Sequence, residues 1–137
     1  MSKPLQFTYT AIDGSLGEAA LMPILPIRLI KSNLQLEKFG LLDTGATVNV
    51  LPFSIGKELG LIWEELNIPL RLSGNLATQE ARAVLLQGQI AHFSPVRLAF
   101  AWTQSDSIPL ILGQTNFFME FNVCFFRSQF LFEVSAK

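Results

Sequence analysis

An aspartate in the middle of an apolar run is the feature that most constrains this sequence. Asp43 follows two leucines, and the apolar run resumes at Val48 in an alternating pattern. A carboxylate is costly to bury unless it is paired or hydrogen-bonded. Directly after it, Thr44 offers a hydroxyl group, and Gly45 permits a tight turn and a close backbone approach. The pattern predicts a strand, a sharp turn and a second strand, with the carboxylate at the mouth of a core and backbone N–H groups around it.

The rest of the chain favours a mainly β domain. Apolar and polar residues alternate along several short segments, and turn signals such as Asp13-Gly14-Ser15 separate them. This period of two is typical of strands. Two prolines in residues 21–30 predict an edge or bulged strand there. Short helices are expected at 53–60, ended by Gly60, and at 116–120. Strands are expected at residues 5–11, 21–30, 34–42, 48–51, 68–72, 81–90, 96–102, 109–112, 121–125 and 130–134.

Two motifs resemble those of the retropepsin-like aspartic proteases. Asp-Thr-Gly-Ala at residues 43–46, between apolar flanks and followed by Val-x-Val-Leu-Pro, resembles the active-site loop of that family. Ile-Pro-Leu-Ile-Leu-Gly at residues 108–113 resembles the family's apolar strand that ends in glycine and precedes a short helix. The resemblance implies a closed β-barrel of the acid-protease type with one or two short helices, as a single domain over residues 1–137.

The resemblance also implies roles for named residues in peptide-bond hydrolysis. Asp43 would be the catalytic carboxylate of an aspartic endopeptidase, and no cofactor would be needed. Thr44 would brace the loop across a dimer, Gly45 would bind substrate backbone, and Ala46 completes the loop. Leu112 and Gly113 would support this loop from the second motif. The hairpin tip at Gly74, Asn75 and Leu76 lies at the position of the family's flap, which closes over substrate.

A single copy of the aspartate motif predicts a homodimer. An aspartic protease needs two carboxylates that share a proton across a bound water. The chain holds three aspartates, and only Asp43 has apolar flanks; Asp13 and Asp106 are expected to be solvated. Two chains must therefore meet on a two-fold axis, each giving one Asp43. The composition agrees, since 50% of the residues are hydrophobic and 15% are charged, which favours a buried interface with another chain.

Composition argues against several other classes of protein. The net charge of −1 gives no electrostatic case for nucleic acid. The single cysteine, Cys124, excludes an intrachain disulfide and is expected to be a small core residue. One histidine, His92, and one cysteine make no zinc site. The apolar run at 19–30 is too short to span a membrane. With no targeting segment in view, we expect a soluble cytoplasmic protein.

The sequence departs from the family pattern in two places, which leaves alternatives open. Gln114-Thr115-Asn116 follows the second glycine, where many relatives carry Arg and then Asp or Asn; that Arg supports dimer contacts in the viral enzymes. The flap tip holds one clear glycine, Gly74. One alternative is a peptide-binding or assembly module that keeps the fold but does not cleave. Another is a monomeric β-barrel that binds apolar ligands, with Asp43 as a lone polar anchor.

Overall fold

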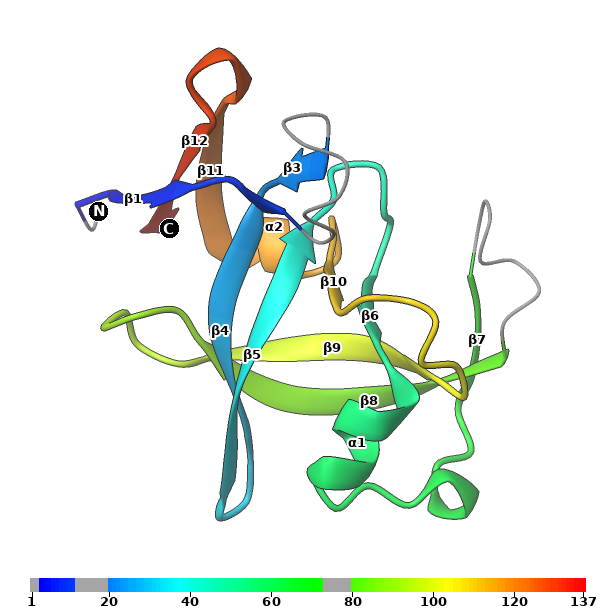
Figure 1. Cartoon of the computed structure of the whole chain (residues 1–137). Coiled ribbons are helices and arrows are strands. Elements are labelled where there is room, and N and C mark those ends of the chain that lie inside the picture. Colours follow the sequence, from blue (N-terminus) through cyan, green and yellow to red (C-terminus); the bar gives the residue numbers. More distant parts are fainter. Residues whose placement is uncertain (1–2, 12–19, 73–79) are drawn as a thin grey trace.

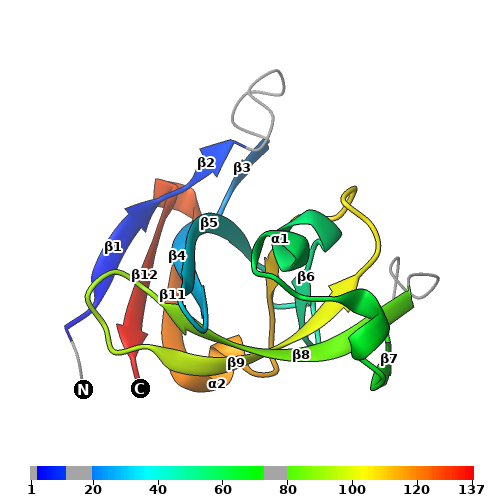
Figure 2. The same ribbon diagram turned by 90° about the horizontal axis from the view of Figure 1, so that it is seen from below.

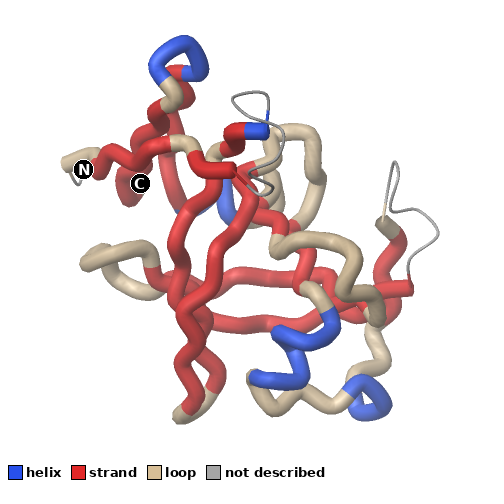
Figure 3. The backbone as a smooth tube through the Cα atoms, viewed as in Figure 1, coloured by secondary structure: helices blue, strands red, loops and turns tan. Residues whose placement is uncertain are grey.

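The computed structural model describes residues 3–11, 20–72 and 80–137, and strands dominate it (Figures 1 and 3). Its main sheet has seven strands in the order β4-β5-β10-β6-β9-β8-β7. An additional pairing between β4 and β8 joins the two ends of the first six strands, so the sheet closes into a barrel with β7 attached to its rim. Closure satisfies the backbone hydrogen bonds that an open edge would leave unpaired. The predicted closed, mainly β barrel is confirmed.

The barrel strands follow the alternating segments of the sequence. They are β4 (Ile24–Lys31), β5 (Leu34–Leu42), β6 (Asn49–Leu51), β7 (Pro69–Arg71), β8 (Glu80–Gln89), β9 (Val96–Thr103) and β10 (Ile111–Leu112). Antiparallel hairpins join β4 to β5, β7 to β8 and β8 to β9. Strand β10 pairs parallel with β5 and antiparallel with β6, which brings the two motifs together in the middle of the sheet. On its other side, β6 pairs parallel with β9.

A second, three-stranded sheet lies beside the barrel, in the order β1-β12-β11 (Figure 2). Its strands are β1 (Leu5–Thr8), β11 (Phe121–Phe126) and β12 (Leu131–Ala136), and both pairings are antiparallel. A two-stranded ribbon joins β2 (Thr10–Ala11) to β3 (Leu21–Met22). The helical elements are α1 (Phe53–Glu58), α2 (Phe117–Glu120) and the short 3-10 turns η2 (Trp63–Glu65) and η4 (Arg127–Gln129).

The apolar side chains form two clusters, one on each face of the central strands. The larger cluster includes Trp102 and Leu51, while the smaller includes Val50 and Ile111. Because neighbouring residues of a strand point to opposite faces, Val50 and Leu51 contribute to different clusters. Burial on both faces accounts for the nearly continuous apolar run at the centre of each motif.

Several expectations about local structure need correction. The strand expected over 5–11 divides into β1 and β2, which pair with different partners. Pro23 interrupts the strand expected over 21–30, and β4 lies inside the closed barrel rather than at an edge. Pro26 is tolerated because β4 pairs there with β5, whereas its pairing with β8 covers residues 28–30. The 3-10 turn η2 was not expected.

Cys124 is also placed differently from the expectation of a small core residue. It is exposed, on β11 at the edge of the three-stranded sheet. Asn122, two residues earlier, lies on the same face of β11 and is also exposed, so the alternation of the strand indicated a solvent-facing side that the expectation overlooked. His92 is exposed in the turn after β8.

Candidate active site

Asp43 is the first residue after β5, and the second motif fixes its position. Strand β10 runs parallel to β5, with Leu112 beside Leu42. The Asp43 N–H donates to the Leu112 carbonyl at 3.0 Å. The side chain of Asp43 is half-buried, so the carboxylate lies where the barrel core meets solvent. The structure therefore brings together the two segments that the sequence marks as motifs.

The residues after Asp43 turn back on its carboxylate. The Gly45 N–H donates to Asp43 Oδ1 at 2.9 Å, and the Ala46 N–H donates to the Asp43 carbonyl at 3.1 Å. Thr44 and Gly45 are exposed at the tip of the turn. A Cβ on Gly45 would lie 3.4 Å from Asp43 Oδ1. Glycine therefore leaves the approach to the carboxylate open, and a backbone N–H group hydrogen-bonds to it, as the sequence predicts.

Gly113 lets the two motifs cross at close range. A Cβ at this position would lie 2.5 Å from the Val48 carbonyl oxygen and 2.8 Å from that of Ala46. Backbone oxygens cannot move aside as a flexible side chain can, so a larger residue would push the segments apart. The next N–H group, that of Gln114, donates to the Ala46 carbonyl at 2.9 Å. Leu112 and Gly113 thus lie directly against the backbone of the aspartate loop.

A buried asparagine connects the motifs from within the core, and sequence reasoning did not identify it. Asn49 is fully buried on β6. Its Oδ1 accepts the Gly113 N–H at 2.8 Å, and its Nδ2 donates to the Ala99 carbonyl at 2.9 Å. Asn116 continues the network, since its Oδ1 accepts the Ala99 N–H at 3.0 Å and its Nδ2 donates to the Arg97 carbonyl at 2.8 Å. An amide between two valines in a buried strand was the signal available in the sequence.

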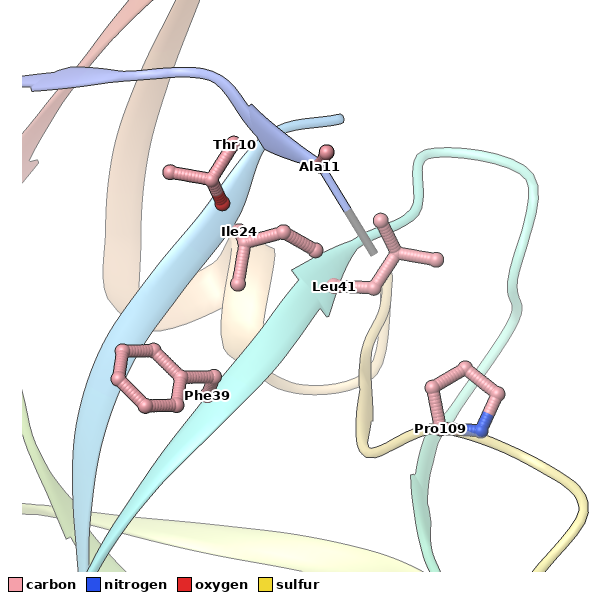
Figure 4. A pocket seen from close by; sticks show the side chains of 6 residues that line it. All are labelled: Thr10, Ala11, Ile24, Phe39, Leu41 and Pro109. Carbon is pink, nitrogen blue, oxygen red and sulfur yellow. The ribbon is translucent and has the colours of Figure 1, made fainter. Parts of the chain in front are cut away.

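An apolar pocket of about 490 Å³ opens beside the loop (Figure 4). Leu41, two residues before Asp43, and Pro109, two residues before β10, lie on one side of it. The remaining wall comes from β2, β4 and β5, through Thr10, Ala11, Ile24 and Phe39. The side chain of Phe39 is 69% exposed, and so large an exposed fraction is unusual for a phenylalanine. The pocket fits an apolar side chain of a bound molecule.

The structure describes the base of the hairpin that we expect to be a flap. Strands β7 and β8 pair antiparallel from Pro69 with Arg82 to Arg71 with Glu80. Leu72 and Ala81 at this base belong to the smaller apolar cluster, against which Val48 of the loop's exit segment also packs. The base of the hairpin therefore packs on the same apolar cluster as the exit segment of the aspartate loop. The proposed tip residues, Gly74, Asn75 and Leu76, lie outside the described residues.

Among residues 3–11, 20–72 and 80–137, no group of three or more His, Cys, Asp or Glu side chains is placed to hold a metal ion. No helix in these ranges is long and apolar enough to cross a membrane.

Asp106 is exposed, and its Oδ1 accepts the Ser54 N–H at 2.8 Å at the start of α1. The carboxylate of Asp106 thus serves a structural role away from the loop.

Comparison with known proteins shows what the fold resembles. No protein-family model and no curated protein matches the sequence. Among solved structures, a retropepsin-like aspartic protease from Rickettsia conorii is similar over 96% of this chain and 91% of its own, with 13% identity and a TM-score of 0.63. The EIAV protease, solved with the inhibitor HBY-793, is similar over 68% of this chain and 82% of its own, with 18% identity and a TM-score of 0.50. The chain has a retropepsin-like fold.

Proposed function

We propose that this protein is an aspartic endopeptidase that acts as a homodimer, with Asp43 of each chain as the catalytic carboxylate. The observation that carries the proposal is the placement of Asp43. In a retropepsin-like fold, it follows β5 directly, is held by the Leu112 carbonyl, and receives the Gly45 N–H on its side chain. A half-buried carboxylate aimed at an open approach, beside an apolar pocket, is suited to chemistry on a bound peptide.

The mechanism follows from two carboxyls that face one water molecule. Two like charges held close together cannot both ionise at low cost, so the pair retains one proton. The ionised Asp43 would accept a proton from the water, which attacks the scissile carbonyl carbon. The protonated Asp43 of the partner subunit would donate to the carbonyl oxygen, which gives a tetrahedral diol. As the C–N bond breaks, the first Asp43 would pass its proton to the leaving nitrogen, and Asp43 of the partner subunit would take a proton back from a hydroxyl of the diol. Gly45 would hydrogen-bond the substrate backbone, and the hairpin carrying Gly74, Asn75 and Leu76 would close over it.

The direct test is digestion of a diverse peptide pool by the purified chain between pH 4 and 8, read by mass spectrometry. The proposal expects new termini at peptide bonds flanked by apolar residues. Binding of peptides without any cleavage, across the whole pH range, would instead support a non-catalytic peptide-binding module with the same fold.

The free edge of β11 supports the proposed dimer. Within the described residues β11 pairs with β12 alone, and Phe125 and Phe126 near its end are 37% and 40% exposed. An apolar edge strand invites pairing with another chain, and a two-fold contact uses the same patch on both subunits. We therefore propose that β11 contributes to the dimer contact.

Phe126→Lys is expected to weaken the dimer, because it brings a charge to an apolar, desolvated contact. The dimer dissociation constant should rise about tenfold or more. Sedimentation of native and variant chains over a range of concentrations measures it. Leu85→Lys is the matched control, since Leu85 is 58% exposed on β8 in the barrel. Equal dissociation constants for the native chain and Phe126→Lys would remove β11 from the contact.

The apolar pocket beside Leu41 predicts a preference for substrates with a large apolar residue near the scissile bond. Phe39→Glu would place a carboxylate at the pocket, and the exposure of Phe39 lets the fold tolerate the change. We expect kcat/KM for apolar peptides to fall about tenfold, and that for peptides with Lys at the same position to fall less or rise. Leu85→Glu serves as the control. An unchanged ranking of peptides after Phe39→Glu would exclude this pocket from substrate binding.

A further inference from the structure

Gln114 stands where many retropepsin-like enzymes carry Arg, and the structure shows what it contacts. Its side-chain Nε2 donates to the Thr44 carbonyl at 2.9 Å. Its backbone N–H donates to the Ala46 carbonyl at 2.9 Å. Gln114 therefore binds the aspartate loop on both sides of Gly45. Both contacts are made within one protomer.

The contact with Thr44 reaches the carboxylate through one peptide group. The Thr44 carbonyl and the Gly45 N–H belong to the same peptide unit, which is planar and rotates as one body. Gln114 holds the oxygen of this unit, and its N–H donates to Asp43 Oδ1 at 2.9 Å. Rotation of the peptide would break both hydrogen bonds at once. A donor on the carbonyl also polarises the N–H group, which strengthens its bond to the carboxylate.

We propose that Gln114 is a positioning residue for Asp43, acting from within its own protomer through the Thr44–Gly45 peptide. This inference rests on the proposed function for its catalytic consequence, while its structural part concerns the loop alone. The amide side chain replaces the charged Arg of relatives with a neutral donor of the right length. Its expected contribution is to the geometry of the carboxylate rather than to the contact between chains.

Two variants of similar size separate the donor from the volume of the side chain. Gln114→Met removes the donor and keeps the length. Gln114→Glu can donate to the Thr44 carbonyl when the Glu side chain is protonated. When it is ionised, its carboxylate faces the Thr44 carbonyl, and neither group can donate a hydrogen bond. An exposed Glu titrates near a pKa of about 4.3. The Glu variant should therefore approach native activity at pH 3.5 and lose it at pH 6.5, while the Met variant should be impaired at both.

The first measurement is kcat/KM at protein concentrations well above the dimer dissociation constant of each variant. We expect a loss of about tenfold for Gln114→Met at both pH values, and the same loss for Gln114→Glu at pH 6.5 only; one hydrogen bond of about 1.4 kcal/mol corresponds to this factor. Gln87→Met is the control, because Gln87 is exposed on β8 and pairs with Ile30 and Arg97. If the variants lose activity at low protein concentration but not at these high concentrations, Gln114 acts in the dimer contact and the proposal is overturned.

The second measurement does not depend on catalysis. In amide hydrogen exchange followed by NMR, the Gly45 N–H should exchange at least about tenfold faster in Gln114→Met than in the native chain, with no change in Gln87→Met. A native chain that cleaves no peptide, yet shows this difference, would refute the proposed function and leave the positioning of the loop supported. Unchanged Gly45 exchange in the Met variant would overturn the inference whatever the activity.

Discussion

Asp43→Asn should reduce peptide cleavage to background while the fold remains. Asparagine keeps the shape of the side chain, and its Oδ1 can still accept the Gly45 N–H that Asp43 accepts at 2.9 Å. It cannot take a proton from water or give one to the scissile carbonyl, so the proposed chemistry has no acid or base. Removal of one member of a catalytic set costs roughly three or more orders of magnitude in kcat. Cleavage rates for the native and Asn chains on one peptide measure the effect.

The same substitution has a second consequence, for the dimer. At pH values that force both native carboxyls to ionise, their repulsion opposes association. The Asn variant lacks that repulsion and should dimerise at least as tightly there. Dissociation constants from pH 4 to 8 test this. Asp106→Asn is the matched control, because Asp106 is exposed and its Oδ1 accepts the Ser54 N–H. Undiminished cleavage by Asp43→Asn would eliminate Asp43 as the catalyst.

The sequence predicted the barrel well because its signals were local and physical. Period-two patterning marked the strands, and Gly60, with φ of +80°, lies just beyond α1, which ends at Glu58, two residues before the end of the expected range 53–60. The two motifs lie together in the structure, where the Asp43 N–H donates to the Leu112 carbonyl and Leu112 lies beside Leu42. These features depend on residues adjacent in the chain or on a pattern long enough to be distinctive.

Other features depended on contacts between distant segments, and the sequence could not predict them. Cys124 is exposed on the edge strand β11, on the same face as Asn122, whereas the apolar character of a cysteine alone favoured the core. Pro26 fits inside a closed barrel because β4 pairs with β8 only over residues 28–30, which does not include Pro26. The contact of Gln114 with Thr44 was obscured because this residue differs from the Arg of many retropepsin-like enzymes, and because the contact spans 70 positions.

Asn49 is the clearest example of a residue whose contacts the sequence could not predict. Its substitution is the second change for which we expect a large effect. The side chain is fully buried among apolar residues, yet both ends of its amide are hydrogen-bonded. Asn49→Leu keeps the branching of the side chain, adds volume and removes these bonds. It leaves the buried Gly113 N–H and the part-buried Ala99 carbonyl without those partners, and an orphaned buried group costs about 1–3 kcal/mol. Added apolar burial offsets part of this cost, so we expect the free energy of unfolding to fall by about 2–4 kcal/mol.

Urea unfolding of the native and variant chains at one protein concentration measures this loss, with Asn67→Leu as the control. Asn67 is exposed, and its substitution should change the free energy of unfolding by less than about 0.5 kcal/mol.

Activity gives an independent readout under conditions where both chains are folded. The residue that Asn49 holds, Gly113, directly follows Leu112, whose carbonyl accepts the Asp43 N–H at 3.0 Å. A looser Gly113 should therefore displace Asp43 and lower kcat more than KM changes. Native-like stability in Asn49→Leu would mean that the strand pairing alone holds the two motifs together.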